Sequence, residues 1–230
     1  MKIVMSILAM VLLVGCEQEV KVSEGSSTPI MTIETTPTPA AEIGASGLPV
    51  YRGNAYEEMN GNKPWFTEEE LKVGPFVQFS STDAVGRVFV IDACVGREMP
   101  ETEIEEPLEG NPVGWDDVQY DIVEGGSLYH QGYLFGETED ARNVITITAQ
   151  ADTTLTSFKR KVREYVEGND HLVRLRISPV YEAMNLLCDG IIVEAQSCED
   201  EGEGLSFCVF VYNAQPGVAI DYVTGESSLA

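Results

Sequence analysis

Apolar residues in the last sixty positions of the chain fall into short runs that turn residues interrupt. The runs cover residues 171–181, 185–197, 205–213 and 218–224 and are rich in Val, Ile, Leu, Phe and Tyr. Runs of this length, bounded by Gly, Asn and Asp, are typical of β-strands. The acidic, glycine-containing segment 198–204 joins two of them. It predicts a hairpin tip, because the ligand spacing of an EF-hand calcium loop is absent.

Two further strand pairs are predicted nearer the N-terminus. Residues 75–80 and 86–96 are apolar and β-branched, and the turn-like stretch STDAV separates them. Residues 115–123 and 127–136 lie on either side of the turn EGG. Each pair therefore predicts a hairpin.

Two segments carry helical signals. Residues 66–74 begin with Thr67 as N-cap and Glu70 in the position of a capping box. Residues 156–168 place apolar side chains on one helical face, at Phe158, Val162, Tyr165 and Val166. With the strands, these helices predict an α/β fold of the α+β kind, built on a mixed, mainly antiparallel sheet.

The N-terminus has the order of a secretory leader. One lysine precedes an apolar run that is too short to span a bilayer, and the run ends in LVGC at Cys16. LVGC resembles a bacterial lipobox, which predicts a signal over 1–16 and diacylglycerol on the Cys16 sulfur; the alternative is a plain signal with an incidental cysteine. Residues 17–48 are rich in Ser, Thr, Pro and Glu and predict a disordered tether, so residues 49–230 form the folded domain. The expected location is the extracytoplasmic face of the cell membrane.

The formal charge is −24, from 38 acidic and 14 basic residues. This charge disfavours an indiscriminate nucleic-acid binder, although a local basic groove is still compatible with it because salt screens distant charges. The acidic segment 97–112 is interpreted as a solvent-exposed loop, with cation binding as the alternative. Beyond Cys16, the spacing of the cysteines matches no zinc motif, which leaves disulfides or buried thiols for Cys94, Cys188, Cys198 and Cys208.

Several stretches of the chain form a recognisable series. They are LPVYRGNAYEEMNGNKPWFTEEEL, GRVFVIDACVG, PVGWDDVQYDIVEGGSLYHQGYLFG, RNVIT and VEAQSCEDEGEGLSFCVFVYNAQPGVAIDYVTGES. Together they resemble the DNA/RNA non-specific endonuclease family, in particular streptococcal-type DNA-entry nucleases and the nuclease domain of EssD-like type VII secretion proteins. The resemblance covers nearly all of residues 49–230. It implies a ββα-metal core, also called a His-Me finger, within a mixed α/β domain.

The resemblance also implies where the chemistry of that family would lie. The family motif Leu-Tyr-Asn-Arg-Cys-His-Leu-Ile-Gly aligns with LYHQGYLFG, which places Gln131 at the arginine and Tyr133 at the histidine that acts as general base. The first magnesium ligand falls near Asp152 and the supporting glutamate near Lys159. The pKa of a phenol is about 10 and that of an imidazole about 6.5. At neutral pH a tyrosine is therefore almost entirely protonated and is a poor general base.

Other residues near this motif offer partial substitutes. His130 is close in sequence, but three positions along a strand place it on the opposite face from Tyr133 unless a bulge intervenes. Asp152 can hold Mg²⁺ weakly through a carboxylate, or it can simply stabilise the start of a helix. Lys159, Arg160 and Arg163, together with Lys161, form a basic patch that either contacts phosphate or offsets the acidic domain.

The sequence therefore leads to one preferred function and two alternatives. The preferred function is an envelope lipoprotein whose nuclease-like domain is catalytically impaired and binds a protein, a nucleic acid or another surface ligand. The first alternative is an active metal-dependent nuclease or phosphodiesterase with a rearranged site, linked to DNA uptake or type VII secretion. The second is an immunity-like or regulatory protein that mimics a nuclease and binds its inhibitor or secretion apparatus.

Overall fold

A computed structural model describes residues 47–98 and 103–230. The predicted signal 1–16, its acylation site Cys16 and nearly all of the predicted tether 17–48 lie outside the described residues. Within the described part of the chain, no helix combines the length and the apolar character needed to cross a membrane.

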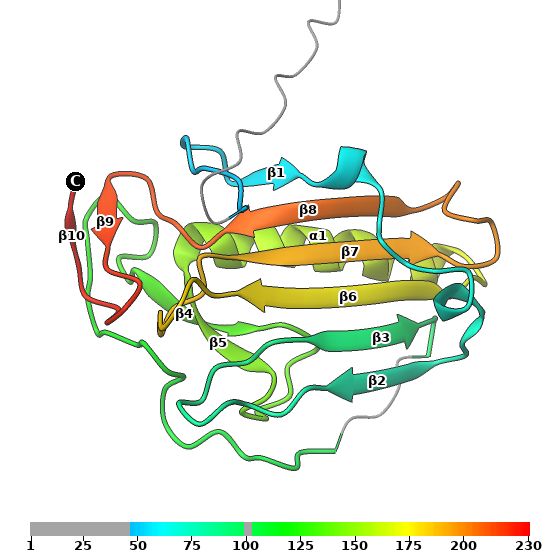
Figure 1. Ribbon diagram of the computed structural model, residues 1–230, viewed down its shortest axis with the longest axis horizontal. Coiled ribbons are helices and arrows are strands. Elements are labelled where there is room, and N and C mark those ends of the chain that lie inside the picture. Colours follow the sequence, from blue (N-terminus) through cyan, green and yellow to red (C-terminus); the bar gives the residue numbers. More distant parts are fainter. Residues whose placement is uncertain (1–46, 99–102) are drawn as a thin grey trace, which may run out of the picture. The chain divides into compact units, whose positions relative to one another are not determined.

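A six-stranded antiparallel sheet forms the centre of the domain (Figure 1). Its strand order is β1-β8-β7-β6-β3-β2. The strands are β1 (Tyr56–Glu58), β2 (Phe76–Phe79), β3 (Ile91–Val95), β6 (Val173–Val180), β7 (Gly190–Ser197) and β8 (Ser206–Tyr212). The predicted hairpin of β2 with β3 and the meander of β6, β7 and β8 are confirmed, and the fold is α+β with mainly antiparallel pairing.

The long helix α1 (Ala149–Gly168) and the hairpin of β4 (Tyr129–Tyr133) with β5 (Val144–Thr148) cover one face of this sheet (Figure 1). Alternate residues of the central strands point to that face, and the strand register aligns them, for example Ile177 with Val193 and Val193 with Val209. Buried side chains of α1 and β5 complete the same core. The alternation of apolar and polar residues thus sets which face receives the helix.

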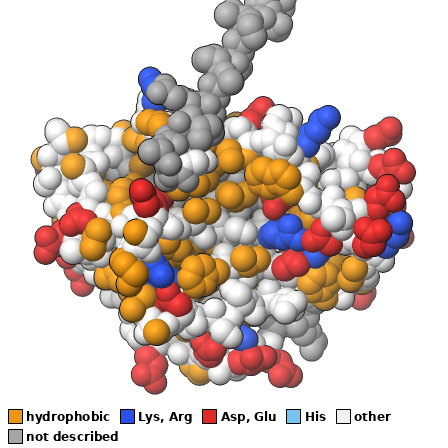
Figure 2. All heavy atoms as spheres, viewed as in Figure 1, with side chains coloured by type: hydrophobic (Ala, Val, Ile, Leu, Met, Phe, Trp, Pro, Cys, Tyr) orange, Lys and Arg blue, Asp and Glu red, His pale blue; other side chains and the backbone are white. Residues whose placement is uncertain are grey.

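Charged side chains and the segment before β2 occupy the opposite face. Arg174 donates to Asp92 at 2.7 Å and lies with its guanidinium over the Phe76 ring. Arg176 pairs with Glu70 of the short 3-10 helix η2 (Glu70–Lys72). Figure 2, which views the sheet from this side, shows acidic side chains around the margin of the face and few basic ones.

Three sequence predictions change in the structure. Residues 66–74 make the capping-box contacts, with Thr67 N donating to Glu70 Oε2 at 2.8 Å, but only a 3-10 turn forms, because Gly74 and Pro75 follow directly. Residues 115–123 form no strand with 127–136 beyond one bridge; the partner of β4 is instead β5. The helix begins at Ala149 rather than at 156, because Thr148 caps it.

The remaining strands form a separate antiparallel pair near the C-terminus, β9 (Val218–Ile220) with β10 (Ser227–Leu229). A further short 3-10 turn, η1 (Asn60–Asn62), lies between β1 and η2. The structure contains Cys94, Cys188, Cys198 and Cys208 as free thiols, of which only Cys198 is partly exposed. A hydrogen bond between the Cys94 and Cys198 thiols raises the pKa of Cys94 and lowers that of Cys198, so these two cysteines are neighbours.

Candidate functional site

The strands β4 and β5 and the helix α1 follow one another as a single ββα unit. In the β4–β5 register, His130 lies opposite Ile147, Gln131 opposite Thr146 and Tyr133 opposite Val144. Thr148 ends β5 and also caps α1, since its hydroxyl oxygen accepts the N–H of Ala151 at 3.2 Å. The helix therefore starts directly at the hairpin, which brings its first turn beside β4.

Tyr133 and Gln131 share one face of β4. The Tyr133 hydroxyl donates to Gln131 Oε1 at 3.5 Å, a long hydrogen bond. Gln131 in turn donates through Nε2 to Asn111 Oδ1 at 3.2 Å, so both side chains face the loop that contains Asn111. Among the hydrogen bonds of the described residues, the Tyr133 hydroxyl has only this amide oxygen as its partner, and an amide is not a base that would take its proton.

His130 lies on the other face of β4 and meets the helix. Its Nδ1 is 2.8 Å from Asp152 Oδ2, in the first turn of α1. The two side chains are 37% and 31% exposed. The structure thus brings His130 and Asp152 together and separates them from the Gln131–Tyr133 pair, as the strand alternation predicts.

Lys159 stands where the resemblance expects a glutamate. Its ammonium donates to the Tyr133 carbonyl oxygen. Burial lowers the pKa of Lys159, while the nearby carboxylate of Asp152 opposes that shift. The Lys159 ammonium therefore lies at the end of β4 and interacts with Asp152, the carboxylate at the metal-ligand position of the alignment.

In this arrangement Asp152 is a poor magnesium ligand, because His130 and Lys159 both interact with its carboxylate. Mg²⁺ requires oxygen ligands in near-octahedral geometry, and it is repelled by a neighbouring ammonium. Asp152 is bonded to an imidazole and lies near Lys159, and the amide oxygen of Gln131 accepts from Tyr133. Residues 47–98 and 103–230 contain no group of three or more His, Cys, Asp and Glu side chains placed to hold a metal.

The basic residues of α1 divide between two faces. Arg160 lies 3.7 Å from Glu164 on the exposed side of the helix, and the Lys161 ammonium lies 4.5 Å from the centroid of the Phe158 ring. Lys159 and Arg163 instead line a cavity between α1 and the sheet. A role in phosphate contact stays a prediction for Lys159, Arg160 and Arg163.

Sequence reasoning missed the cavity and the contact from Lys159 to the Tyr133 backbone. The spacing of Lys159, Val162, Arg163 and Val166 already places them on one helical face. That spacing was a usable signal for the side chains that line the cavity. The backbone contact has no counterpart in the sequence, because every residue has a carbonyl group.

The domain is similar to solved nuclease structures. NucA from Streptococcus agalactiae without metal is 25% identical with a TM-score of 0.65, over 81% of this chain and 92% of NucA. The same NucA with a magnesium ion bound gives 24% and 0.64, over 81% and 93%. The Sda1 nuclease with a bound zinc ion gives 18% and 0.60, over 77% and 97%.

No protein-family model matches the chain, and no curated protein matches it either. The fold is nevertheless that of non-specific endonucleases of the ββα-metal type.

Proposed function

Because the domain has the fold of metal-binding nucleases, we propose that this protein is a cell-envelope lipoprotein in which a nuclease-fold domain binds a ligand without effective hydrolysis. The observation that carries the proposal is the contact between the Lys159 ammonium and the Tyr133 carbonyl. It holds a cation where the family pattern has an acid, against the backbone of Tyr133, the residue whose phenol stands where the pattern has an imidazole. Both changes work against water activation and against a divalent metal.

The expected loss of activity follows from the chemistry. Phosphodiester hydrolysis at neutral pH needs a base that takes a proton from the attacking water. Losing a general base typically lowers the rate by about 10²- to 10⁴-fold. Asp152 does not restore this function for Tyr133, because its carboxylate pairs with His130 on the other face of β4.

The location is part of the proposal and rests on the sequence alone. A diacylglycerol on Cys16 supplies two acyl chains, and two chains anchor a protein durably where one does not. Residues 17–48 would then hold the domain away from the membrane surface. The ligand of such a domain is a protein, a nucleic acid or another molecule of the envelope, and the net charge of −24 makes a nucleic acid the least favoured.

Incubating the full chain with supercoiled plasmid DNA or with RNA, in the presence of Mg²⁺ or Mn²⁺, tests the proposal. We expect both polymers to stay intact under conditions in which a metal-dependent nuclease of the same fold degrades them. Metal-dependent digestion that Tyr133→Phe abolishes would refute the proposal, since it would give the phenol a catalytic role.

A second function is favoured by one observation, the pair of His130 and Asp152. A carboxylate that holds an imidazole through Nδ1 fixes the ring and leaves Nε2 able to accept a proton. The protein would then be an active phosphodiesterase with a rearranged site, serving DNA uptake or type VII secretion. In that case His130→Gln removes turnover, whereas the matched change His171→Gln, at the histidine that bonds Tyr165 in the last turns of α1, leaves most of it.

A further inference from the structure

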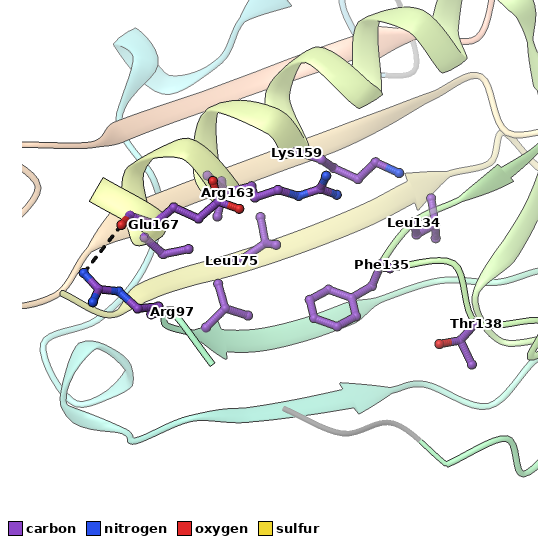
Figure 3. Close-up of a pocket in the computed structure, with 12 residues that line it drawn as sticks. Arg97, Leu134, Phe135, Thr138, Lys159, Arg163, Glu167 and Leu175 are labelled. Atoms are coloured by element: carbon purple, nitrogen blue, oxygen red, sulfur yellow. Dashed lines mark hydrogen bonds between the residues drawn. The ribbon is translucent and has the colours of Figure 1, made fainter. Parts of the chain in front are cut away.

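A cavity of about 360 Å³ lies between the C-terminal half of α1 and the sheet (Figure 3). Its size is within the range of about 300–1,000 Å³ that small-molecule sites usually have. Its walls are buried apolar side chains from both layers and from the segment after β4, namely Val95, Leu134, Phe135, Val162, Val166 and Leu175. Such walls favour an aliphatic group over a polar one.

Basic side chains lie at both ends of this cavity (Figure 3). Lys159 and Arg163 extend from α1, and Arg97 follows β3 at the other end (Figure 3). Arg97 donates through Nη2 to the Glu167 carbonyl oxygen at 3.5 Å, and Glu167 is the acidic residue of this rim. Since the whole chain has only 14 basic residues against 38 acidic ones, Lys159 and Arg163, which extend toward the same end of the cavity (Figure 3), form a local site for a negative group.

We propose that this cavity binds a single acyl chain with an anionic head group, the chemistry shared by a fatty acid and a single-chain lipid phosphate. The chain would lie against Phe135 and Leu175, and the head group would contact Lys159 and Arg163. A nucleotide fits less well, because the polar edge of a base would meet apolar walls and leave donors and acceptors without partners. A neutral hydrocarbon would make no use of the two cations.

The volume limits the length of the chain. A water molecule occupies about 30 Å³ in the liquid, and a methylene group is of similar size, so the cavity holds on the order of ten carbon atoms. This ligand site shares Lys159 with the candidate site, whose Tyr133 carbonyl accepts from the same ammonium, but binding here does not require the proposed loss of hydrolysis. The cavity lies along α1 beyond the His130–Asp152 pair, and binding there uses no step of phosphodiester chemistry.

Calorimetric titration of the purified full chain with octanoate, decanoate and dodecanoate tests the proposal. Each buried methylene contributes about 0.8 kcal/mol, so affinity should rise about fourfold per added methylene until the cavity is full. Dodecanoate and dodecyl phosphate distinguish the two sources of the head group, and dodecanol removes the charge. We expect both anions to bind at least tenfold more tightly than dodecanol.

Two variants and one control place the binding in this cavity. Arg163→Gln should weaken dodecanoate binding about tenfold, the ratio for one charge-assisted hydrogen bond at a partly exposed site. Lys72→Gln, which removes an exposed cation of η2 outside the cavity lining, should leave it unchanged. Val166→Phe should fill the cavity and abolish binding; if this variant unfolds, the comparison of Arg163→Gln with Lys72→Gln still tests whether the cavity binds the ligand.

Several results would overturn the proposal. They are an absence of saturable binding, equal affinity for dodecanol and dodecanoate, and equal losses of affinity in Arg163→Gln and Lys72→Gln. Displacement of dodecanoate by adenosine monophosphate at lower concentration would also overturn it, in favour of a nucleotide.

Discussion

Replacing Asp140 by asparagine should strongly destabilise the domain. Asp140 is fully buried in the connection between β4 and β5. Its Oδ2 accepts Arg142 Nη2 at 2.8 Å and the Glu105 N–H at 2.9 Å, and its Oδ1 accepts Arg142 Nε at 2.9 Å. The side chain thus joins the loop around Glu105 to the connection that carries Leu134 and Phe135 of the cavity wall.

The magnitude follows from breaking a buried ion pair on one side. Asparagine keeps the shape of the side chain but removes its charge, and its NH₂ group would face N–H donors. Removing one partner of a buried ion pair in this way typically lowers the free energy of unfolding by about 3–5 kcal/mol. Arg142 also donates to Glu105 Oε2 at 2.6 Å, so its charge is not left alone. We therefore expect the loss of unfolding free energy at pH 7 to lie near the lower end, at about 3 kcal/mol.

The pH dependence has a definite sign. Burial by itself raises the pKa of Asp140, but the hydrogen bonds from Arg142 and from backbone N–H groups outweigh it and hold the pKa well below its usual range. A carboxyl group with a lowered folded-state pKa stabilises the fold above its unfolded pKa of about 3.9 and loses that contribution as the pH falls. The difference between wild type and Asp140→Asn should be constant from about pH 5 to 7 and shrink below about pH 4.

Urea unfolding at several pH values measures this difference directly. Asp121→Asn, an exposed acid-to-amide change, is the control and should alter the free energy by less than about 0.5 kcal/mol. A loss below about 1 kcal/mol in Asp140→Asn, or a difference that grows as the pH falls to 3, would refute this account of the buried pair.

Three further predictions concern the ββα unit and its support. Gly132→Ala should cost about 1–3 kcal/mol in urea unfolding, because its Cβ would lie 2.4 Å from Ile147 Cγ2, and adding Ile147→Leu, which has no second γ-carbon on its β-carbon, should recover part of the loss. Asn213→Ala should cost about 3 kcal/mol, since the buried Asn213 accepts the Thr148 N–H at 2.8 Å and would leave it unpaired; a loss under 1 kcal/mol contradicts this. His130→Gln should change stability by less than about 1 kcal/mol, because the pair with Asp152 is about one-third exposed; a larger loss by thermal melting would show a structural role.

The sequence predicts the central sheet well and the ββα unit only in part. Strands β6, β7 and β8 are long apolar runs between clear turns, so local pattern is sufficient for them. Strand β5 has no alternation, because all five of its residues are buried, and its partner β4 is fixed by tertiary packing rather than by a short turn. The first turns of α1 are rich in threonine, which weakens the helical signal before residue 156.

The candidate site shows the same division. Strand alternation correctly places His130 and Tyr133 on opposite faces, and the position of Asp152 near a helix start is also predictable. The pairing of Asp152 with His130 depends on where α1 begins, which the sequence pattern puts about two turns too late. The contact of Lys159 with a backbone carbonyl depends on the three-dimensional arrangement of β4 and α1 and has no sequence signal.

Restoring the family residues tests the central claim most directly. The measurement is the initial rate of Mg²⁺-dependent plasmid cleavage by wild type and by the variant Gln131→Arg, Tyr133→His, Lys159→Glu. The account predicts that wild type cleaves no faster than the protein-free control. The variant should cleave at least about 10²-fold faster than that control, which is the lower end of what a general base contributes. Wild-type cleavage at a rate equal to or above that of the variant would contradict it.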